Sequence, residues 1–147
     1  MKGKSVLVTG GARRIGRAIA LAMAAAGADV AFTYLTSAED ARQTVADLKA
    51  RGVRVLALRC DVREEKSIAT ALRQLKAKFG GLDVLVNNAG AYDTIDFEKL
   101  TARQWDDMFA TNTRGPFLIS RLATPLLRVR KGRIINIASL GGLRPWA

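Results

Sequence analysis

The stretch Val6–Ala20 reads VLVTGGARRIGRAIA and decides the fold. A short apolar run is followed by a turn that contains glycines and then by the start of an alanine-rich helix. In such a turn, backbone N–H groups and a helix N-terminus face a phosphate, because unpaired donors and the helix dipole both favour an anion. Gly10 supplies the tight turn and Gly16 allows close packing of helix on strand, whereas Arg14 replaces the middle glycine of the dinucleotide fingerprint. The stretch therefore predicts a nucleotide phosphate site, although its motif is imperfect.

The composition is typical of a globular domain. The chain has 147 residues, of which 49% are hydrophobic and 6% aromatic, which predicts one domain over residues 1–147 with a substantial core. No apolar run reaches the roughly 18 residues of a membrane helix, and the apolar run near Met1 is too short for a signal peptide. The single cysteine, Cys60, excludes an internal disulfide, fits a reducing compartment and is expected to be buried at a strand end. We expect a cytoplasmic protein that does not contact a membrane.

The net charge of +11 arises from 24 lysine and arginine residues against 13 acidic residues. Such a balance can indicate a nucleic-acid surface, but the cations are spread from Lys2 to Arg144 without interleaved aromatic residues. We therefore expect solvated charges and no nucleic-acid partner; the alternative, a nucleic-acid binder, would show steeply salt-dependent affinity. The absence of histidine excludes a Ser-His-Asp triad and, with one cysteine, a structural zinc site, so no metal is expected.

Strand and helix signals alternate along the chain. Strands are expected at 5–8, 29–34, 54–58, 82–86 and 133–138, and helices at 14–26, 38–50, around 68–79 and 102–129, the second and fourth helices capped by Thr36-Ser37 and Thr101. Residues 139–147 are expected to form a loop. This alternation predicts an α/β fold with helices on both faces of a parallel sheet. Right-handed crossovers make it a doubly wound sheet (a Rossmann fold) of order 3-2-1-4-5, with the ligand beyond the carboxyl ends of the strands.

Chemically distinctive residues follow those strand ends in a consistent order. They are Thr9-Gly10, Arg14-Ile15-Gly16, Asp61-Val62, Asn87-Asn88-Ala89-Gly90, Asn112 and Ser139. In this order and spacing they resemble the short-chain dehydrogenase/reductase family, and the likeness runs through the whole chain. Arg14 in the turn resembles pteridine-reductase-like and 3-oxoacyl-reductase-like members. The resemblance implies an oxidoreductase that reduces a small-molecule carbonyl to an alcohol by hydride transfer, and a homo-oligomer in the complete protein.

The residues after the second strand favour NADP(H) over NAD(H). An NAD site usually has an acidic residue there that binds the ribose 2′-OH, but residues 33–37 include no acid. Arg13, Arg14 and Ser37 are placed to share a 2′-phosphate through charge-assisted hydrogen bonds, and Tyr34 lies at the adenosine end. The alternative is that these arginines are ordinary surface charges.

The resemblance also implies roles for the later motifs. Asp61 would accept a hydrogen bond from the adenine amino group while the adjacent backbone N–H donates one, and the small residues Ala89 and Gly90 would let the backbone approach a ribose. A plain strand-end carboxylate and an ordinary turn are the alternatives. Asn87 is expected to bond neighbouring strands. The cofactor-binding candidates are Gly10, Arg13, Arg14, Ile15, Gly16, Tyr34, Ser37, Asp61, Val62, Asn88, Ala89 and Gly90.

Asn112 and Ser139 are the candidate catalytic residues. Asn112 shares a helical stripe with Trp105 and Phe109 that is expected to be buried, and Pro116 has no N–H for the carbonyl of Asn112. The helix is expected to bend there, and the resemblance implies that this free carbonyl holds a water of a proton relay. Ser139 is expected to point into the cleft mouth, where the resemblance implies a bond to the substrate oxygen. The alternatives are a satisfied buried amide beside a kink and a loop serine.

The match ends before the Tyr-x-x-x-Lys pair that the resemblance implies for catalysis. That pair belongs beyond Ala147, and Tyr34 and Tyr92 lie in the wrong places to replace the tyrosine. We therefore expect a C-terminally truncated part of the family fold that binds NADP(H) weakly and is inactive, with the last strand left as an unpaired apolar edge. A non-catalytic nucleotide-binding sensor or scaffold is the alternative.

Overall fold

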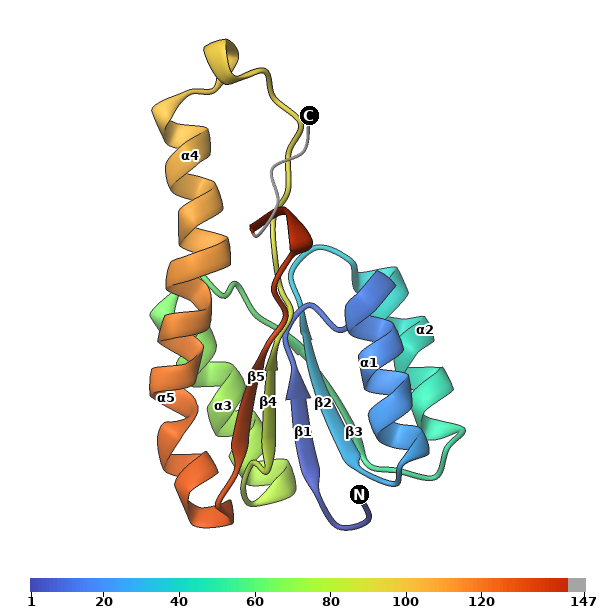
Figure 1. Ribbon diagram of the computed structural model, residues 1–147. Coiled ribbons are helices and arrows are strands. Elements are labelled where there is room, and N and C mark those ends of the chain that lie inside the picture. Colours follow the sequence, from blue (N-terminus) through green and yellow to red (C-terminus); the bar gives the residue numbers. More distant parts are fainter. Residues whose placement is uncertain (143–147) are drawn as a thin grey trace.

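The computed structural model describes residues 1–142 and shows a five-stranded sheet between two layers of helices (Figure 1). The main elements are β1 (Ser5–Val8), α1 (Arg14–Ala25), β2 (Asp29–Tyr34), α2 (Ala38–Lys49), β3 (Val55–Arg59), α3 (Glu65–Phe79), β4 (Val84–Asn87), α4 (Ala102–Phe109), α5 (Gly115–Arg130) and β5 (Arg133–Asn136). All strand pairs are parallel, and their order is β3-β2-β1-β4-β5. The predicted fold class and strand order are confirmed.

The differences from the predicted elements are local. The single helix expected at 102–129 is divided by a π-helical turn, Ala110–Arg114, between α4 and α5. Thr101 caps α4 in a capping box with Gln104. Ser37 is the N-cap residue of α2, as expected, but its hydroxyl makes no capping hydrogen bond. Within the expected loop 139–147, Leu140–Gly142 forms a short 3-10 turn, and residues 143–147 lie outside the described part.

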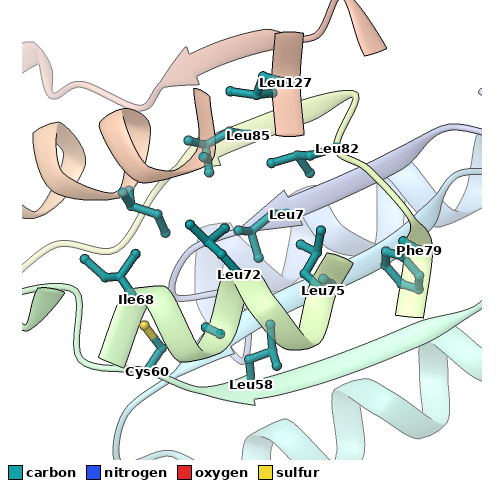
Figure 2. Packing of buried hydrophobic residues seen from close by; sticks show 14 of the residues in the cluster. Leu7, Leu58, Cys60, Ile68, Leu72, Leu75, Phe79, Leu82, Leu85 and Leu127 are labelled. Atoms are coloured by element: carbon teal, nitrogen blue, oxygen red, sulfur yellow. The ribbon is translucent and has the colours of Figure 1, made fainter. Parts of the chain in front are cut away.

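The two helix layers bury the sheet on both faces. α1 and α2 cover one face, and α3 and α5 cover the other (Figure 1). The second layer contributes leucines, Ile68 and Phe79 that meet Leu7, Leu58 and Leu85 of the sheet (Figure 2). On the first face, small Ala20 and Ala24 allow α1 to pack closely on β2 and β1. Double coverage explains why β1 is buried at every position.

Cys60 lies in the same apolar cluster as Ile68 and is 3% exposed, as predicted for a buried strand-end cysteine (Figure 2). Burial raises the pKa of its thiol, which keeps it protonated at neutral pH.

Every helix in the described residues is too short or too polar to cross a membrane.

Asp83 ties the amino end of β4 to β1. Its carboxylate accepts hydrogen bonds from the backbone N–H of Ser5 at 2.9 Å, from the Ser5 hydroxyl at 3.2 Å and from Lys4 Nζ at 3.0 Å. Burial raises the pKa of Asp83, but these hydrogen bonds outweigh burial and the pKa lies below its usual value. Since the folded-state pKa is depressed, the stabilisation is present above the unfolded pKa of about 3.9 and is lost as pH falls through the folded value.

We therefore expect Asp83→Asn to lower the free energy of unfolding at pH 7 by about 1–3 kcal/mol and to flatten its decline on acidification below about pH 4. Urea unfolding followed by circular dichroism across this pH range measures both effects. Asp96→Asn is the control, because Asp96 is exposed and pairs with Lys99 on the same short segment. If the free energy of unfolding fell equally with decreasing pH in wild type and in Asp83→Asn, this expectation would be contradicted.

β5 is an apolar edge of the sheet. It pairs with β4 on one side, and no strand among residues 1–142 pairs with its other side. Ile134, Ile135 and Ile137 are 43%, 41% and 42% exposed. Because an open apolar edge can pair with another chain, we expect the 147-residue polypeptide to self-associate as its concentration rises.

Ile135→Lys should reduce this association, because a charged residue disfavours edge-to-edge pairing. Size-exclusion chromatography with light scattering measures it, and Val129→Lys is the control because Val129 is exposed on α5 and is not part of the strand. A wild-type polypeptide that stays monomeric at every concentration would refute the prediction.

Candidate functional site

A cleft of about 500 Å³ opens at the carboxyl edge of the sheet. Its walls come from the β1–α1 turn, the β2–α2 loop, the β3–α3 loop, the segment after β4 and Thr111 of the π-helical turn. This is the crevice where the strand order reverses, the place at which doubly wound sheets bind ligands. Among its lining residues are all the predicted cofactor-binding candidates: Gly10, Arg13, Arg14, Ile15, Gly16, Tyr34, Ser37, Asp61, Val62, Asn88, Ala89 and Gly90. Their placement agrees with the prediction, while their roles stay predictions.

Glycines bring the β1–α1 turn against the segment after β4. Gly10 has a φ of +65°, and a Cβ there would lie 3.1 Å from the Cα of Ala89. A Cβ on Gly16 would lie 2.2 Å from the carbonyl oxygen of Gly10 and 2.5 Å from Nδ2 of Asn88. Only glycine fits at position 16, because a backbone oxygen blocks the space.

The first turn of α1 presents amide groups to the cleft wall. At the start of α1, the N–H of Arg17 donates a hydrogen bond to the carbonyl oxygen of Arg13, and no side chain caps the helix. The N–H groups of Arg14, Ile15 and Gly16 are therefore among those that lack intrahelical acceptors, and all these residues line the cleft. The N–H of Gly10, in contrast, donates to Thr33 Oγ1 at 3.1 Å. The donors available to an anion thus come from the helix start, not from Gly10.

Two arginines stand at the rim beside this helix start. Neither Arg13 nor Arg14 has an ion-pair partner in the portion of the chain that the structure covers. Arg14 has a φ of +51°, a left-handed conformation that costs a non-glycine residue about 1–2 kcal/mol. An uncompensated positive charge held in a strained backbone is the kind of feature that concentrates at ligand sites.

Thr9 fastens the segment after β4 to the turn. Its Oγ1 accepts hydrogen bonds from the N–H groups of Asn88 and Ala89, both at 2.9 Å. Asn88 Nδ2 returns bonds to the carbonyl oxygens of Thr9 at 2.9 Å and Gly10 at 3.3 Å. Thr9 was not among the predicted site residues, because nothing in a threonine after a strand indicates which amides it will bind.

Asn87 does not line the cleft but links structural layers. Its Nδ2 donates to Asn136 Oδ1 at 2.8 Å and to Ser120 Oγ at 3.0 Å. Asn136 belongs to β5 and Ser120 to α5, so the expected bonding to a neighbouring strand is confirmed.

Asp61 is bound by a neighbouring arginine. Its carboxylate accepts hydrogen bonds from the backbone N–H, Nε and Nη2 of Arg63, and Arg63 Nη1 lies 3.6 Å from Oδ1 of Asp107. The Arg63 guanidinium therefore lowers the pKa of Asp61. Arg63 lines the cleft as well and was missed in the sequence, where the only available signal was its position two residues after Asp61.

Asn112 is exposed, so the expectation of a buried amide is wrong. The rings of Trp105 and Phe109 stack with their centroids 4.7 Å apart. Both side chains are also half exposed, because α4 projects beyond the carboxyl edge of the sheet (Figure 1). The side chain of Asn112 is nevertheless satisfied: Oδ1 accepts from the N–H of Ala91 and Nδ2 donates to its carbonyl, each at 2.8 Å. In place of a simple bend, a π-helical turn precedes Pro116, which has no N–H for the carbonyl of Asn112.

Ser139 is not among the residues that line the cleft, and its role at the cleft mouth stays a prediction. Its Oγ is exposed and accepts a hydrogen bond from the N–H of Gly141 at 3.2 Å, because the chain turns back after Leu140. Ser139 still follows the end of β5, where the N–H of Ile137 bonds the carbonyl of Asn87. Tyr92 is 88% exposed in the loop after β4 and is not among the residues that line the cleft. Over residues 1–142, no three His, Cys, Asp or Glu side chains are placed to hold a metal.

Comparison with known proteins agrees with this geometry. Residues 4–147 match the family described as short chain dehydrogenase. A 3-oxoacyl-(acyl-carrier-protein) reductase of Staphylococcus aureus is 41% identical over 140 residues, which are 95% of this chain and 57% of that relative. A crystal structure of a short chain dehydrogenase from Burkholderia cenocepacia in complex with NADP has a TM-score of 0.93 at 39% identity, covering 99% of this chain and 59% of that one. A dehydrogenase/reductase from Sinorhizobium meliloti gives a TM-score of 0.92 at 42% identity, covering 99% and 58%. The chain thus spans little more than half the length of these relatives.

Proposed function

Because the chain belongs to the short-chain dehydrogenase family of oxidoreductases, which use nicotinamide cofactors, we propose that residues 1–147 form the NADP(H)-binding domain of a carbonyl reductase. The observation that carries the proposal is one cleft lined by a helix N-terminus, by two arginines without an ion-pair partner in residues 1–142, and by a strand-end carboxylate. When bound, NADPH supplies the hydride that reduces a carbonyl to an alcohol. A small-molecule carbonyl or alcohol is the proposed substrate, and a homo-oligomer the proposed state of the complete protein.

The β1–α1 turn fits the pyrophosphate of a dinucleotide. The amides of Arg14, Ile15 and Gly16 would donate to its oxygens, and the dipole of α1 favours their negative charge. The missing side chain of Gly16 keeps α1 close enough to β1 and Asn88 for this wall to form.

The 2′-phosphate of NADP(H) would lie beside Arg13, Arg14 and Ser37. All three residues line the cleft, and Thr36 joins them there. Residues 33–37 include no acid, which removes the group that would bind an NAD ribose and repel a phosphate. The NADP complex of the Burkholderia cenocepacia relative supports this choice.

The remaining candidates complete the proposed site. Asp61 and the N–H of Val62 would recognise adenine, and Ala89 and Gly90 would lie along a ribose. The carbonyl of Asn112 would hold a relay water, since Pro116 leaves it without its usual donor. Ser139 would bind the substrate oxygen. The 147 residues include no Tyr-x-x-x-Lys pattern, so this polypeptide would bind NADP(H) weakly and turn over no substrate.

Titration with NADPH and NADH tests the proposal. NADPH should bind the folded chain more tightly than NADH, and the double variant Arg13→Ala/Arg14→Ala should weaken NADPH about tenfold or more while leaving NADH nearly unchanged, since charge-assisted bonds to the 2′-phosphate are lost. Isothermal titration calorimetry measures the affinities, and adenosine 2′,5′-bisphosphate should compete.

Arg17→Ala is the matched control, because Arg17 lies one turn further along α1 and pairs with Asp47 outside the cleft. It should leave the NADPH-to-NADH ratio unchanged. The proposal would be overturned if the folded wild-type chain showed no binding of NADPH, or bound NADPH and NADH with equal affinity.

A further inference from the structure

Both carboxylate oxygens of Asp61 accept hydrogen bonds from one neighbouring arginine, Arg63. Its Oδ1 accepts from the backbone N–H of Arg63 at 2.9 Å and from Nε at 3.0 Å. Its Oδ2 accepts from Nε at 3.2 Å and from Nη2 at 2.7 Å. The single Nε–H is shared between the two oxygens, so three N–H groups of Arg63 bind a carboxylate that offers about four acceptor sites. The group proposed to recognise the adenine amino group is thus already largely engaged by one arginine.

Arg63 also stands between two carboxylates. It lines the cleft and, together with Ala91 and Thr111, a neighbouring cavity of about 240 Å³ that includes Asp107 of α4. Its Nη1 lies 3.6 Å from Asp107 Oδ1, which is an ion pair but too long for a hydrogen bond. Asp107 is the more exposed partner, with 58% of its side chain accessible against 18% for Asp61. Movement of the guanidinium toward Asp107 would release Asp61 into the cleft.

We propose that Arg63 determines how strictly this site selects a 6-aminopurine over a 6-oxopurine nucleotide. The inference rests on the proposed function. A free Asp61 carboxylate accepts from the amino group of adenine and repels the carbonyl oxygen of hypoxanthine. The guanidinium of Arg63 reverses both effects, because it occupies the carboxylate and offers donors to a 6-oxo group. Asp107 opposes Arg63 by attracting the guanidinium away from Asp61.

The test compares NADPH with its hypoxanthine analogue, reduced nicotinamide hypoxanthine dinucleotide phosphate. The two ligands carry the same charge, so long-range electrostatic effects of a variant cancel in the ratio of their dissociation constants. Arg63→Ala should raise the preference for NADPH about tenfold, because Asp61 becomes free to accept a charged hydrogen bond. Asp107→Asn should lower the preference, because Arg63 is then held by Asp61 alone, and Arg63→Ala/Asp107→Asn should match Arg63→Ala.

Arg73→Ala is the control, since Arg73 is an exposed arginine of α3 that bonds Thr70 on its own helix and should leave the ratio unchanged. The role of Arg63 is overturned if the preference for NADPH over the hypoxanthine analogue is unchanged in Arg63→Ala, or is unchanged or raised in Asp107→Asn. The proposed function still stands in that case, provided that the chain binds NADPH. A folded wild-type chain that binds neither dinucleotide overturns the proposed function instead. Asp107→Asn is an independent test if Arg63→Ala does not fold, because Asp107 is exposed.

Discussion

Gly16→Ala is expected to abolish detectable NADPH binding and to lower the free energy of unfolding by about 3 kcal/mol. The new Cβ would lie 2.2 Å from the carbonyl oxygen of Gly10 and 2.5 Å from Nδ2 of Asn88. The first of these atoms is backbone, so no side-chain rotation relieves the overlap. α1 must move away from β1, which opens the wall that carries the amides proposed to bind the phosphates and strains the bonds of Asn88 to Thr9 and Gly10.

Urea unfolding and a calorimetric NADPH titration of the same sample measure the two losses. Gly52→Ala is the matched control, because Gly52 has a φ of +74° and no atom within 4 Å of its would-be Cβ. That control should cost about 1 kcal/mol of backbone strain and leave NADPH affinity unchanged. If Gly16→Ala kept the wild-type midpoint and affinity, the close approach of α1 to β1 would not be what forms the site.

The parts of the site that lie on the backbone were accessible from sequence. Gly10 and Gly16 constrain the chain directly, and buried parallel strands separated by helices leave few topologies, so strand ends far apart in the sequence had to share one edge. The residues that line the cleft follow from that edge alone. For this reason the cleft contains the predicted set although its first motif departs from the usual glycine pattern.

The placement of side chains was harder to predict from the sequence, because it depends on which segments pack against one another in the fold. The stripe of Trp105, Phe109 and Asn112 indicated an apolar face but not what covers it, and in the described residues that face is half exposed. The hydroxyl of Ser139 turned to Gly141 for the same reason: a local backbone donor competes with the cleft. Arg63 shows the converse, since a side chain without a motif reaches the carboxylate two residues before it and binds both of its oxygens.

Thr9→Val is expected to lower the free energy of unfolding by about 2–5 kcal/mol, although valine has nearly the shape of threonine. Thr9 is 2% exposed, and its Oγ1 is the acceptor for the N–H groups of both Asn88 and Ala89. Valine leaves these part-buried donors without that acceptor, and each unsatisfied donor costs about 1–3 kcal/mol. Because Asn88 and Ala89 line the cleft, NADPH affinity should fall as well.

Thr9→Ser separates the hydroxyl from the methyl group of Thr9. It keeps the acceptor and removes a buried methyl, so it should cost about 1 kcal/mol and largely retain NADPH affinity. Thr70→Val controls for the chemical change, since Thr70 is exposed on α3 and bonds Lys66 of its own helix. Urea unfolding midpoints and NADPH titrations of the three variants distinguish the effect of the lost hydroxyl from that of the lost methyl group. If serine destabilised more than valine, packing of the methyl group rather than the paired amides would hold the segment after β4 against the turn, and Thr9 would have no specific part in shaping the cleft.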